Sequence, residues 1–491
     1  MPDHLALLEP VRDLLEGADY TVDGVRRLLG PVAGGALARD EIVPALRATG
    51  GGSPLETLTR LFWLQVPVAA APELAEPLVA AGLAAGSGDE LRPLLHVEPL
   101  ESVTGSGHAG WAVSDLKVRP GSGDALRPDH VVGAGGASAN LARLVVHSPV
   151  DNALDLGTGC GVQALHLADP KVRPRPVRIT ATDVNPRALE LAAMSFALSG
   201  IGDVELLEGS LLEPVRGWRF DLIVSNPPFV VTPPGESRHS YRETGMPGDE
   251  FCRRLVTEGP ALLTDGGHLH MLANWLHVEG EPWEERVGAW AAESGCEAWI
   301  VQRDVQDPAE YAELWLRDSA EAGTPGYRRR YEAWLEAFQA QRVAGIGFGW
   351  ITLRRSGAAD PAIRVEELRH AVEQPVGAYV DRVLDGLAAS QSFSTGCGKV
   401  VRAAAGIVQE QIGPPGAEDP ERILLRQSGG LRRAAGVGTV EAALAGVCDG
   451  SLPLDRLLDA IAQLMDLDSD QVRAHADAVL PELIADGFFE V

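Results

Sequence analysis

Between residues 152 and 354 the hydrophobic pattern alternates short apolar runs with helix-spaced segments. Such runs are typical of buried strands, and apolar residues three or four positions apart are typical of helices. This alternation, with short connections, predicts an α/β fold: a parallel, doubly wound (Rossmann-like) sheet with helices on both faces. The last run contains several glycines, which favours an edge or antiparallel strand. The predicted strands are Ala153–Leu156, Ile179–Val184, Val204–Leu207, Phe220–Ser225, His268–Ala273, Ala298–Val301 and Val343–Leu353.

Different patterns flank this region and predict three domains. Residues 1–98 and 359–491 show mainly helical spacing, each ending in a short apolar run, so both are predicted to be mainly helical and winged-helix-like. Residues 99–358 are predicted to form the catalytic domain. Before its first strand lies a glycine-rich run, Gly133–Ala137, followed by an amphipathic helix at Asn140–Val146. The glycines there suit either close contact with a ligand or a tight turn.

The composition narrows the choice of partners and of cell compartment. The chain of 491 residues has 42 Lys and Arg against 69 Asp and Glu, a net charge of −27. An acidic surface repels phosphate backbones, so nucleic acid is disfavoured as the main partner. The five scattered cysteines form no metal-binding pattern and fit reduced thiols in the cytoplasm. We also expect no membrane span, because acidic residues and prolines interrupt the most apolar stretch, Leu61–Gly86.

The stretch Asp221–Phe229 is the strongest chemical signal in the sequence. It reads Asp-Leu-Ile-Val-Ser-Asn-Pro-Pro-Phe, and Pro227 ends the apolar strand because it cannot donate to a sheet. Asn226 Oδ1 and the Pro227 carbonyl can each accept one hydrogen of a flat –NH2 group, and Phe229 can stack on its plane. The pattern therefore predicts a site that orients the lone pair of an amino nitrogen.

Two earlier strands also end in ligand-binding patterns. Asp155–Gly161 has glycine at every second position after the first strand, which suits either a ligand without phosphates or a plain tight turn. Asp183 ends the second strand. Its carboxylate can accept hydrogen bonds from both hydroxyls of a ribose, or it can cap the helix beginning at Pro186. Ser210 follows the third strand and can lie at the edge of an adenine or cap the next segment.

Taken in order, these three motifs resemble the class I S-adenosylmethionine-dependent methyltransferases that methylate amino groups. That group includes the release factor glutamine methyltransferases and the small-domain RNA methyltransferases. The resemblance covers about Trp111–Arg354 and implies a seven-stranded sheet, with its last strand antiparallel, and S-adenosyl-L-methionine as cofactor. It implies that Asp155, Gly157, Gly159, Gly161, Asp183 and Ser210 bind the cofactor, and that Asn226, Pro227 and Phe229 hold the target amino group.

The substrate side is also expected to involve Pro228 and the loop Val230–Asp249, where Tyr241 and Arg242 are candidate contacts. Trp275, at the end of the fifth strand, can line the same pocket or fill the core. His239 and His270 are interpreted as structural, because transfer from a sulfonium needs no strong base, metal or covalent nucleophile. RNA contacts could come from only two basic runs, Lys171–Arg178 and Arg328–Arg330.

The sequence thus predicts an N-methyltransferase acting on a planar amino group, with a protein glutamine amide as the first choice. A protein or peptide substrate is favoured over RNA by the acidic balance and by the additional domains, and those terminal domains are also candidates for self-association. Three alternatives stay open: a methyltransferase of an RNA base (guanine N2 or adenine N6), a methyltransferase of a natural-product or peptide amine, and a non-catalytic protein that binds the cofactor.

Overall fold

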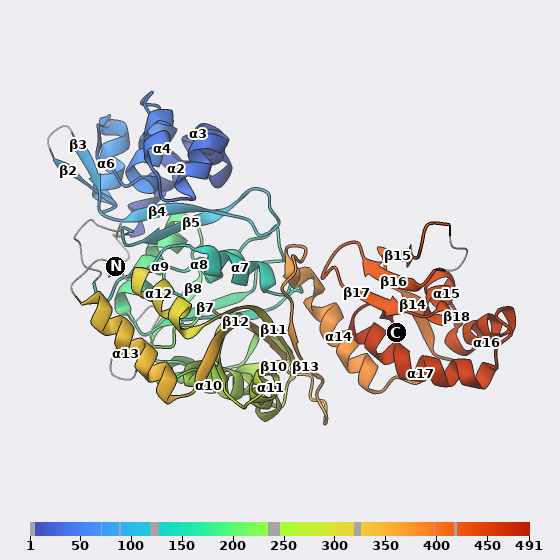
Figure 1. Cartoon of the computed structure of the whole chain (residues 1–491). Helices are drawn as coiled ribbons and strands as arrows, with labels where there is room; N and C mark the ends of the chain where they lie inside the picture. Colours follow the sequence, from blue (N-terminus) through green and yellow to red (C-terminus); the bar gives the residue numbers. More distant parts are fainter. Residues whose placement is uncertain are drawn as a thin grey trace.

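A large, mostly parallel sheet forms the centre of the molecule (Figure 1). In the part of the chain that the structure describes, this sheet has eight strands in the order β13-β11-β12-β10-β9-β6-β7-β8. The computed structural model describes residues 5–69, 71–87, 90–117, 127–233, 246–318, 326–396, 398–416 and 420–491. The strands are β6 Asn152–Leu156, β7 Arg178–Asp183, β8 Val204–Glu208, β9 Phe220–Ser225, β10 Leu263–Val278, β11 Glu297–Gln306, β12 Val343–Arg354 and β13 Ile363–Glu367.

The α/β class predicted from the sequence is confirmed. Strands β8, β7, β6, β9 and β10 run parallel, and β12 is antiparallel to both of its neighbours, β10 and β11. All seven predicted strands are present. The sheet of the described residues nevertheless has eight strands rather than seven, because β13 pairs in parallel with β11. The antiparallel β12 lies inside the sheet and not at its edge, because it pairs with β10 on one side and with β11 on the other.

Helices connect these strands and cover both faces of the sheet, as Figure 1 shows. The predicted helix at Asn140–Val146 begins earlier, at Gly136, so its first turn comes from the glycine-rich run. The long connection between β11 and β12 contains two helices that pack against each other, α12 and α13. The helices of this region are α7 Gly136–Leu144, α8 Val162–Leu167, α9 Pro186–Leu198, α10 Glu250–Glu258, α11 Trp283–Ser294, α12 Pro308–Asp318 and α13 Tyr327–Ala340, with short 3-10 helices at Glu213–Val215 and Gly259–Leu262.

The N-terminal region shares its hydrophobic core with the β6–β8 half of the sheet. Tyr20 Oη donates to the Val97 carbonyl at 2.9 Å, and Trp111 Nε1 donates to the Tyr20 carbonyl at 2.8 Å. These buried bonds attach the helices to the hairpin of β4 and β5. The elements are α2 Leu8–Gly17, α3 Val22–Leu37, α4 Val43–Ala48, α5 Pro54–Leu58, a π-helix at Thr59–Trp63, β1 Val68–Ala69, α6 Pro72–Ala80, β2 Ala84–Ser87, β3 Glu90–Pro93, β4 His96–Glu101 and β5 His108–Ser114.

The C-terminal region has a separate hydrophobic core and two small sheets among its described residues. The sequence predicted its helices but did not locate strands β14 to β18; the winged-helix-like topology stays a prediction. The elements are a 3-10 helix at Val376–Tyr379, α14 Val380–Gln391, β14 Val400–Ala403, β15 Ile407–Ile412, β16 Arg422–Gln427, β17 Ala434–Val437, α15 Thr439–Val447, β18 Asp449–Pro453, α16 Leu454–Leu464, α17 Ser469–Ala485 and β19 Phe489–Glu490.

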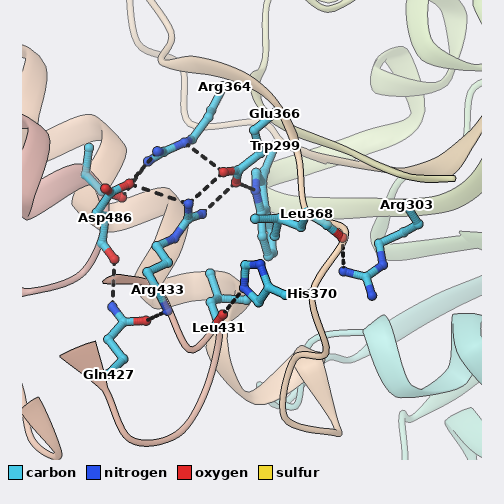
Figure 2. A network of polar contacts seen from close by, with 11 residues as sticks. Trp299, Arg303, Arg364, Glu366, Leu368, His370, Gln427, Leu431, Arg433 and Asp486 are labelled. Atoms are coloured by element: carbon cyan, nitrogen blue, oxygen red, sulfur yellow. Dashed lines mark hydrogen bonds and ion pairs between the residues drawn. The ribbon is translucent and has the colours of Figure 1, made fainter. Parts of the chain in front are cut away.

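A buried network of charges joins this C-terminal region to the edge strand β13 (Figure 2). Both guanidinium nitrogens Nη1 and Nη2 of Arg433 donate to the Glu366 carboxylate at 2.6 Å. Arg364 and Asp486 complete the network, and they pair with each other. Trp299 Nε1 of β11 also donates to Glu366 at 2.6 Å. Paired charges therefore hold together strand β13, the C-terminal end of α17 and the connection between β16 and β17, in addition to any apolar contact.

Among the described residues, no helix combines the length and the apolar character needed to cross a bilayer.

Candidate functional site

The glycine loop after β6 has the backbone conformation that its sequence requires. Gly157, Gly159 and Gly161 have φ values of 73°, 55° and 88°, a region that other residues rarely adopt. A Cβ atom on Gly161 would lie 2.7 Å from the ring of Phe196, whereas none on Gly157 or Gly159 would meet an atom within 4 Å. The first two glycines thus leave open space above the loop, and the third allows α8 to pack against α9.

Asp155 supports this loop from within the core. Its side chain is fully buried, and Oδ2 accepts hydrogen bonds from Thr158 Oγ1 at 2.6 Å and from the Ala164 backbone N–H at 3.0 Å. Burial raises the pKa of Asp155 to about 7. Asp155 does not line the cavity described below, so its geometry is that of a residue that positions the loop.

Asp183 connects the tips of β6 and β7. One carboxylate oxygen accepts from the Gly159 backbone N–H and the other from the Asn185 backbone N–H, both at 2.9 Å. Burial raises the pKa of Asp183 despite these hydrogen bonds. The cap of α9 is Asn185, whose side chain accepts from Arg187 N, and not Asp183. Of the two roles open for Asp183 from the sequence, capping this helix is therefore excluded, and the residue lines the cavity.

The tip of β9 lies next to the glycine loop. Ser225 Oγ donates to the Leu156 carbonyl at 2.8 Å, which fixes the two strand ends side by side. Asn226 follows, and its Oδ1 atom is buried without a hydrogen-bond partner among the described residues. Its Nδ2 atom lies 3.5 Å from Ser138 Oγ on α7, at the limit of a hydrogen bond. An acceptor oxygen in this state is costly unless a ligand supplies a donor.

A cavity of about 570 Å³ joins these features. Ser210, at the tip of β8, lies on its wall, as do Pro227, Pro228 and Phe229. Among the described residues that line the cavity, Asp183 is the only Asp or Glu and no Lys or Arg is present. A phosphate-rich ligand would therefore lack charge partners there. Nor do the described residues contain a cluster of His, Cys, Asp and Glu able to hold a metal ion.

Several predicted or considered residues lie elsewhere. Tyr241, Arg242 and His239 fall outside the described residues. Trp275 is fully buried and donates to Gln302 Oε1 at 3.0 Å, so it fills the core and does not line the cavity. His270 is likewise fully buried, and burial lowers its pKa well below the ordinary value.

The sequence pointed only weakly, or not at all, to other parts of the cavity wall. The glycine-rich run was a candidate for ligand contact, and Gly133, Gly135 and Gly136 do line the cavity. No signal marked Trp315 of α12. Val230 and Met246, from the predicted substrate loop Val230–Asp249, also line the cavity, and the wall residues that the sequence did not indicate include His130, Val131, Val132, Phe251 and Leu255.

Most of the residues that line the cavity belong to a part of the chain that matches a known protein family. Residues 135–282 match a family model described as a methyltransferase small domain, and residues 17–94 match a domain of unknown function (DUF7059). The central region is similar to protein glutamine methyltransferases. The release factor glutamine methyltransferase of Deinococcus radiodurans is 40% identical over 148 residues, which are 28% of this chain and 51% of that protein.

Other relatives extend this likeness to a second kind of protein substrate. The ribosomal protein uL3 glutamine methyltransferase of Bradyrhizobium diazoefficiens is 29% identical over 35% of this chain and 57% of that protein. The chain thus spans little more than half the length of these curated relatives. A solved methyltransferase of Pyrococcus furiosus overlaps 49% of this chain and 89% of its own, with 16% identity and a TM-score of 0.28.

Proposed function

We propose that this protein is an S-adenosylmethionine-dependent N-methyltransferase that acts on the side-chain amide of a protein glutamine. The observation that carries the proposal is the buried, unpartnered Oδ1 of Asn226, a residue that lines the same cavity as the glycine loop. The likeness of residues 135–282 to the methyltransferase small domain supports the same reaction.

The described residues on the β6–β8 side of the cavity fit adenosylmethionine. The open backbone of Gly157 and Gly159 gives room for a ligand in close contact, and the Asp183 carboxylate can accept hydrogen bonds from ribose hydroxyls. Ser210 lies on the wall beyond it, at the tip of β8. When bound, this cofactor supplies a methyl group carried on a positively charged sulfur.

The residues at the tip of β9 would orient the acceptor. Asn226 Oδ1 and the Pro227 carbonyl accept the two N–H groups of the glutamine amide, and Phe229 packs on its plane. An amide nitrogen is a weak nucleophile, so in-line positioning and stabilisation of the positive charge that develops on nitrogen are the main requirements. Transfer of that methyl group to the oriented nitrogen would leave the cofactor as a neutral thioether, and the nitrogen would release one proton to water.

RNA is the alternative polymer, and the two basic runs do not favour it. Arg173 and Arg330 have exposed fractions of only 4% and 3%. Lys171 Nζ donates to the His108 carbonyl at 2.9 Å, and Arg328 pairs with Glu332 at 2.9 Å. Two of these cations are therefore buried and two are paired within the chain, whereas Arg175, Arg178 and Arg329 of the same runs are exposed.

The regions before and after the cavity-forming part of the chain also have proposed roles. Residues 99–358 would form the catalytic domain, and residues 1–98 and 359–491 would contact the protein substrate or a second copy of the chain. A reducing compartment, the cytoplasm, fits the four described cysteines, which are buried and unpaired.

The direct test incubates the full chain with methyl-labelled adenosylmethionine and, separately, a translation release factor, ribosomal proteins and total RNA. We expect label that survives ribonuclease, disappears with protease, and maps by mass spectrometry to one glutamine. Label that disappears with ribonuclease would favour the RNA alternative. No label on any polymer, with the cofactor still bound, would favour a non-catalytic role or a small-molecule amine.

Replacing Asp183 by alanine is expected to weaken adenosylmethionine binding by about 10- to 100-fold, because hydrogen bonds to a charged acceptor are lost. Isothermal calorimetry measures this directly. Asp203→Ala, in the exposed connection before β8, is the matched control and should leave the affinity unchanged. Unchanged affinity in a folded Asp183→Ala variant would remove this residue from the ribose site.

A further inference from the structure

The acceptor side of the cavity has an aromatic wall supplied by α12. Trp315 lines the cavity, and its ring lies 6.5 Å from that of Phe229 in an edge-to-face arrangement with an angle of 69°. Met246, Phe251 and Leu255 continue this wall from the α10 side. Helix α12 lies beyond residue 282, where the match to the methyltransferase small domain ends. The chain thus adds a cavity wall of its own to the matched region.

Buried hydrogen bonds fix α12 against the segment that follows the Asn226–Phe229 motif. Tyr311 Oη accepts from the Val231 backbone N–H at 2.9 Å and from Asn274 Nδ2 at 3.0 Å. Tyr311 is fully buried and packs against Trp315 with a ring separation of 6.0 Å. Trp315 is therefore held at a set position relative to the motif by a residue one helical turn earlier.

We propose that Trp315 is a specificity-determining residue that, with Phe229, forms the wall of the acceptor pocket and selects a neutral, planar carboxamide over a charged amine. This inference rests on the proposed methyl transfer and names the acceptor chemistry of that site. The other polar side chains that line the cavity around Asn226, those of Ser138, Gln163 and Ser225, carry no charge.

The chemistry of the wall gives the reason for this selectivity. An ammonium group has no lone pair and must lose a proton before it can accept a methyl group. Among the described residues lining the acceptor side, no Asp, Glu or His is present to take that proton or to balance the charge. A carboxamide is neutral, can stack on an aromatic ring, and needs only two acceptors to orient its nitrogen.

The first test compares Trp315→Ala, Trp315→Phe and Leu314→Ala in the full chain. The probe is a translation release factor, or the protein that the wild type labels, and the readouts are kcat and KM for that protein and cofactor affinity by calorimetry. We expect Trp315→Ala to lower kcat/KM by about 10-fold or more, since a large apolar contact with the acceptor is lost. Trp315→Phe should restore most of it, and cofactor affinity should stay within about 2-fold in every variant.

Leu314 is the matched control, because it neighbours Trp315 on α12, is 41% exposed and does not line the cavity. A folded Trp315→Ala variant with unchanged kcat/KM would overturn the inference while leaving the proposed function intact. Equal losses in the alanine and phenylalanine variants, together with lost cofactor binding, would assign Trp315 a structural role and also overturn it. Absence of transfer by the wild type would instead defeat the proposed function, and this inference with it.

The second test measures charge selectivity without the protein substrate. The full chain saturated with S-adenosylhomocysteine is mixed with N-acetylglutamine amide or with N-acetylornithine amide, a charged amine of similar length. Saturation-transfer NMR is expected to detect the glutamine probe on the wild type, to lose most of that signal in Trp315→Ala, and to detect little binding of the amine. Equal binding of the two probes would contradict the inference.

Discussion

Replacing Asn226 by alanine is expected to lower kcat for methyl transfer by about 10²- to 10³-fold, the range seen when one preorganised polar group facing the transition state is removed. The affinity for adenosylmethionine should change by less than about 2-fold. The reason lies in position: Asn226 follows β9, whereas Asp183 and the glycine loop, the proposed cofactor contacts, follow β7 and β6. Single-turnover transfer and calorimetry measure the two quantities separately.

The control for this variant is Asn152→Ala. Asn152 begins β6, and so lies at the opposite end of the strand from the glycine loop and does not line the cavity. Transfer by this control should match the wild type. If Asn226→Ala lost cofactor affinity to the same extent as transfer while remaining folded, the side chain would belong to the cofactor side, and the assignment of the acceptor site would have to change.

The sequence predicted that the glycine loop, Asp183 and Asn226 lie together, because each of them follows a strand. Apolar runs located β6, β7 and β9, and parallel strands place their carboxyl ends at one edge of the sheet. Gly157, Asp183 and Asn226 were therefore expected to lie together although they span about 70 positions of the chain, and the structure places all three on one cavity wall. No spatial information beyond strand order was needed for that prediction.

The place of Trp315 on the cavity wall could not be predicted in the same way. Helix α12 reads as an ordinary amphipathic helix, and periodicity identifies a buried face without telling which buried ring meets the core and which meets a cavity. Tyr311 and Trp315 lie on the same face, yet Tyr311 is fully buried and Trp315 is partly exposed and lines the cavity. Only the packing of α12 against the segment after Phe229 decides between these roles.

Asp155 shows a different limit of sequence reasoning. It occupies the first position of a ligand-binding motif, and the motif alone does not tell which of its members touch the ligand. In the structure its carboxylate accepts from Thr158 and Ala164 and stays inside the turn. The eighth strand, β13, was missed because its sequence, Ile-Arg-Val-Glu-Glu, is too polar to predict a buried strand. Its charged side chains can lie in the sheet because partners in the C-terminal region pair with them.

That pairing predicts the largest effect on stability. Replacing Glu366 by alanine is expected to lower the opening free energy of β13 by about 3–5 kcal/mol, because removing one partner leaves buried, uncompensated charges. Arg433, only 9% exposed, would lose its bidentate partner and keep only the longer contact with Asp486 at 3.5 Å, and Trp299 would lose the acceptor of its indole N–H. Hydrogen–deuterium exchange of the β13 amides reports this local free energy even though the chain has several cores.

The adjacent residue provides the matched control, and pH provides a second readout. Glu367 pairs with the exposed Arg369 and accepts from the buried Gln302 Nε2 at 3.1 Å, so Glu367→Gln, which keeps an acceptor oxygen, should cost less than about 1 kcal/mol. Burial raises the pKa of Glu366, but Arg433 and Arg364 outweigh it and hold the pKa below its ordinary value. Its stabilising contribution is thus complete above the ordinary carboxyl pKa and is lost as the pH falls through the lowered value. Glu366→Gln should lack that acid-dependent loss; if β13 opened in acid equally in this variant and the wild type, ionised Glu366 would not be what holds the C-terminal region to the sheet.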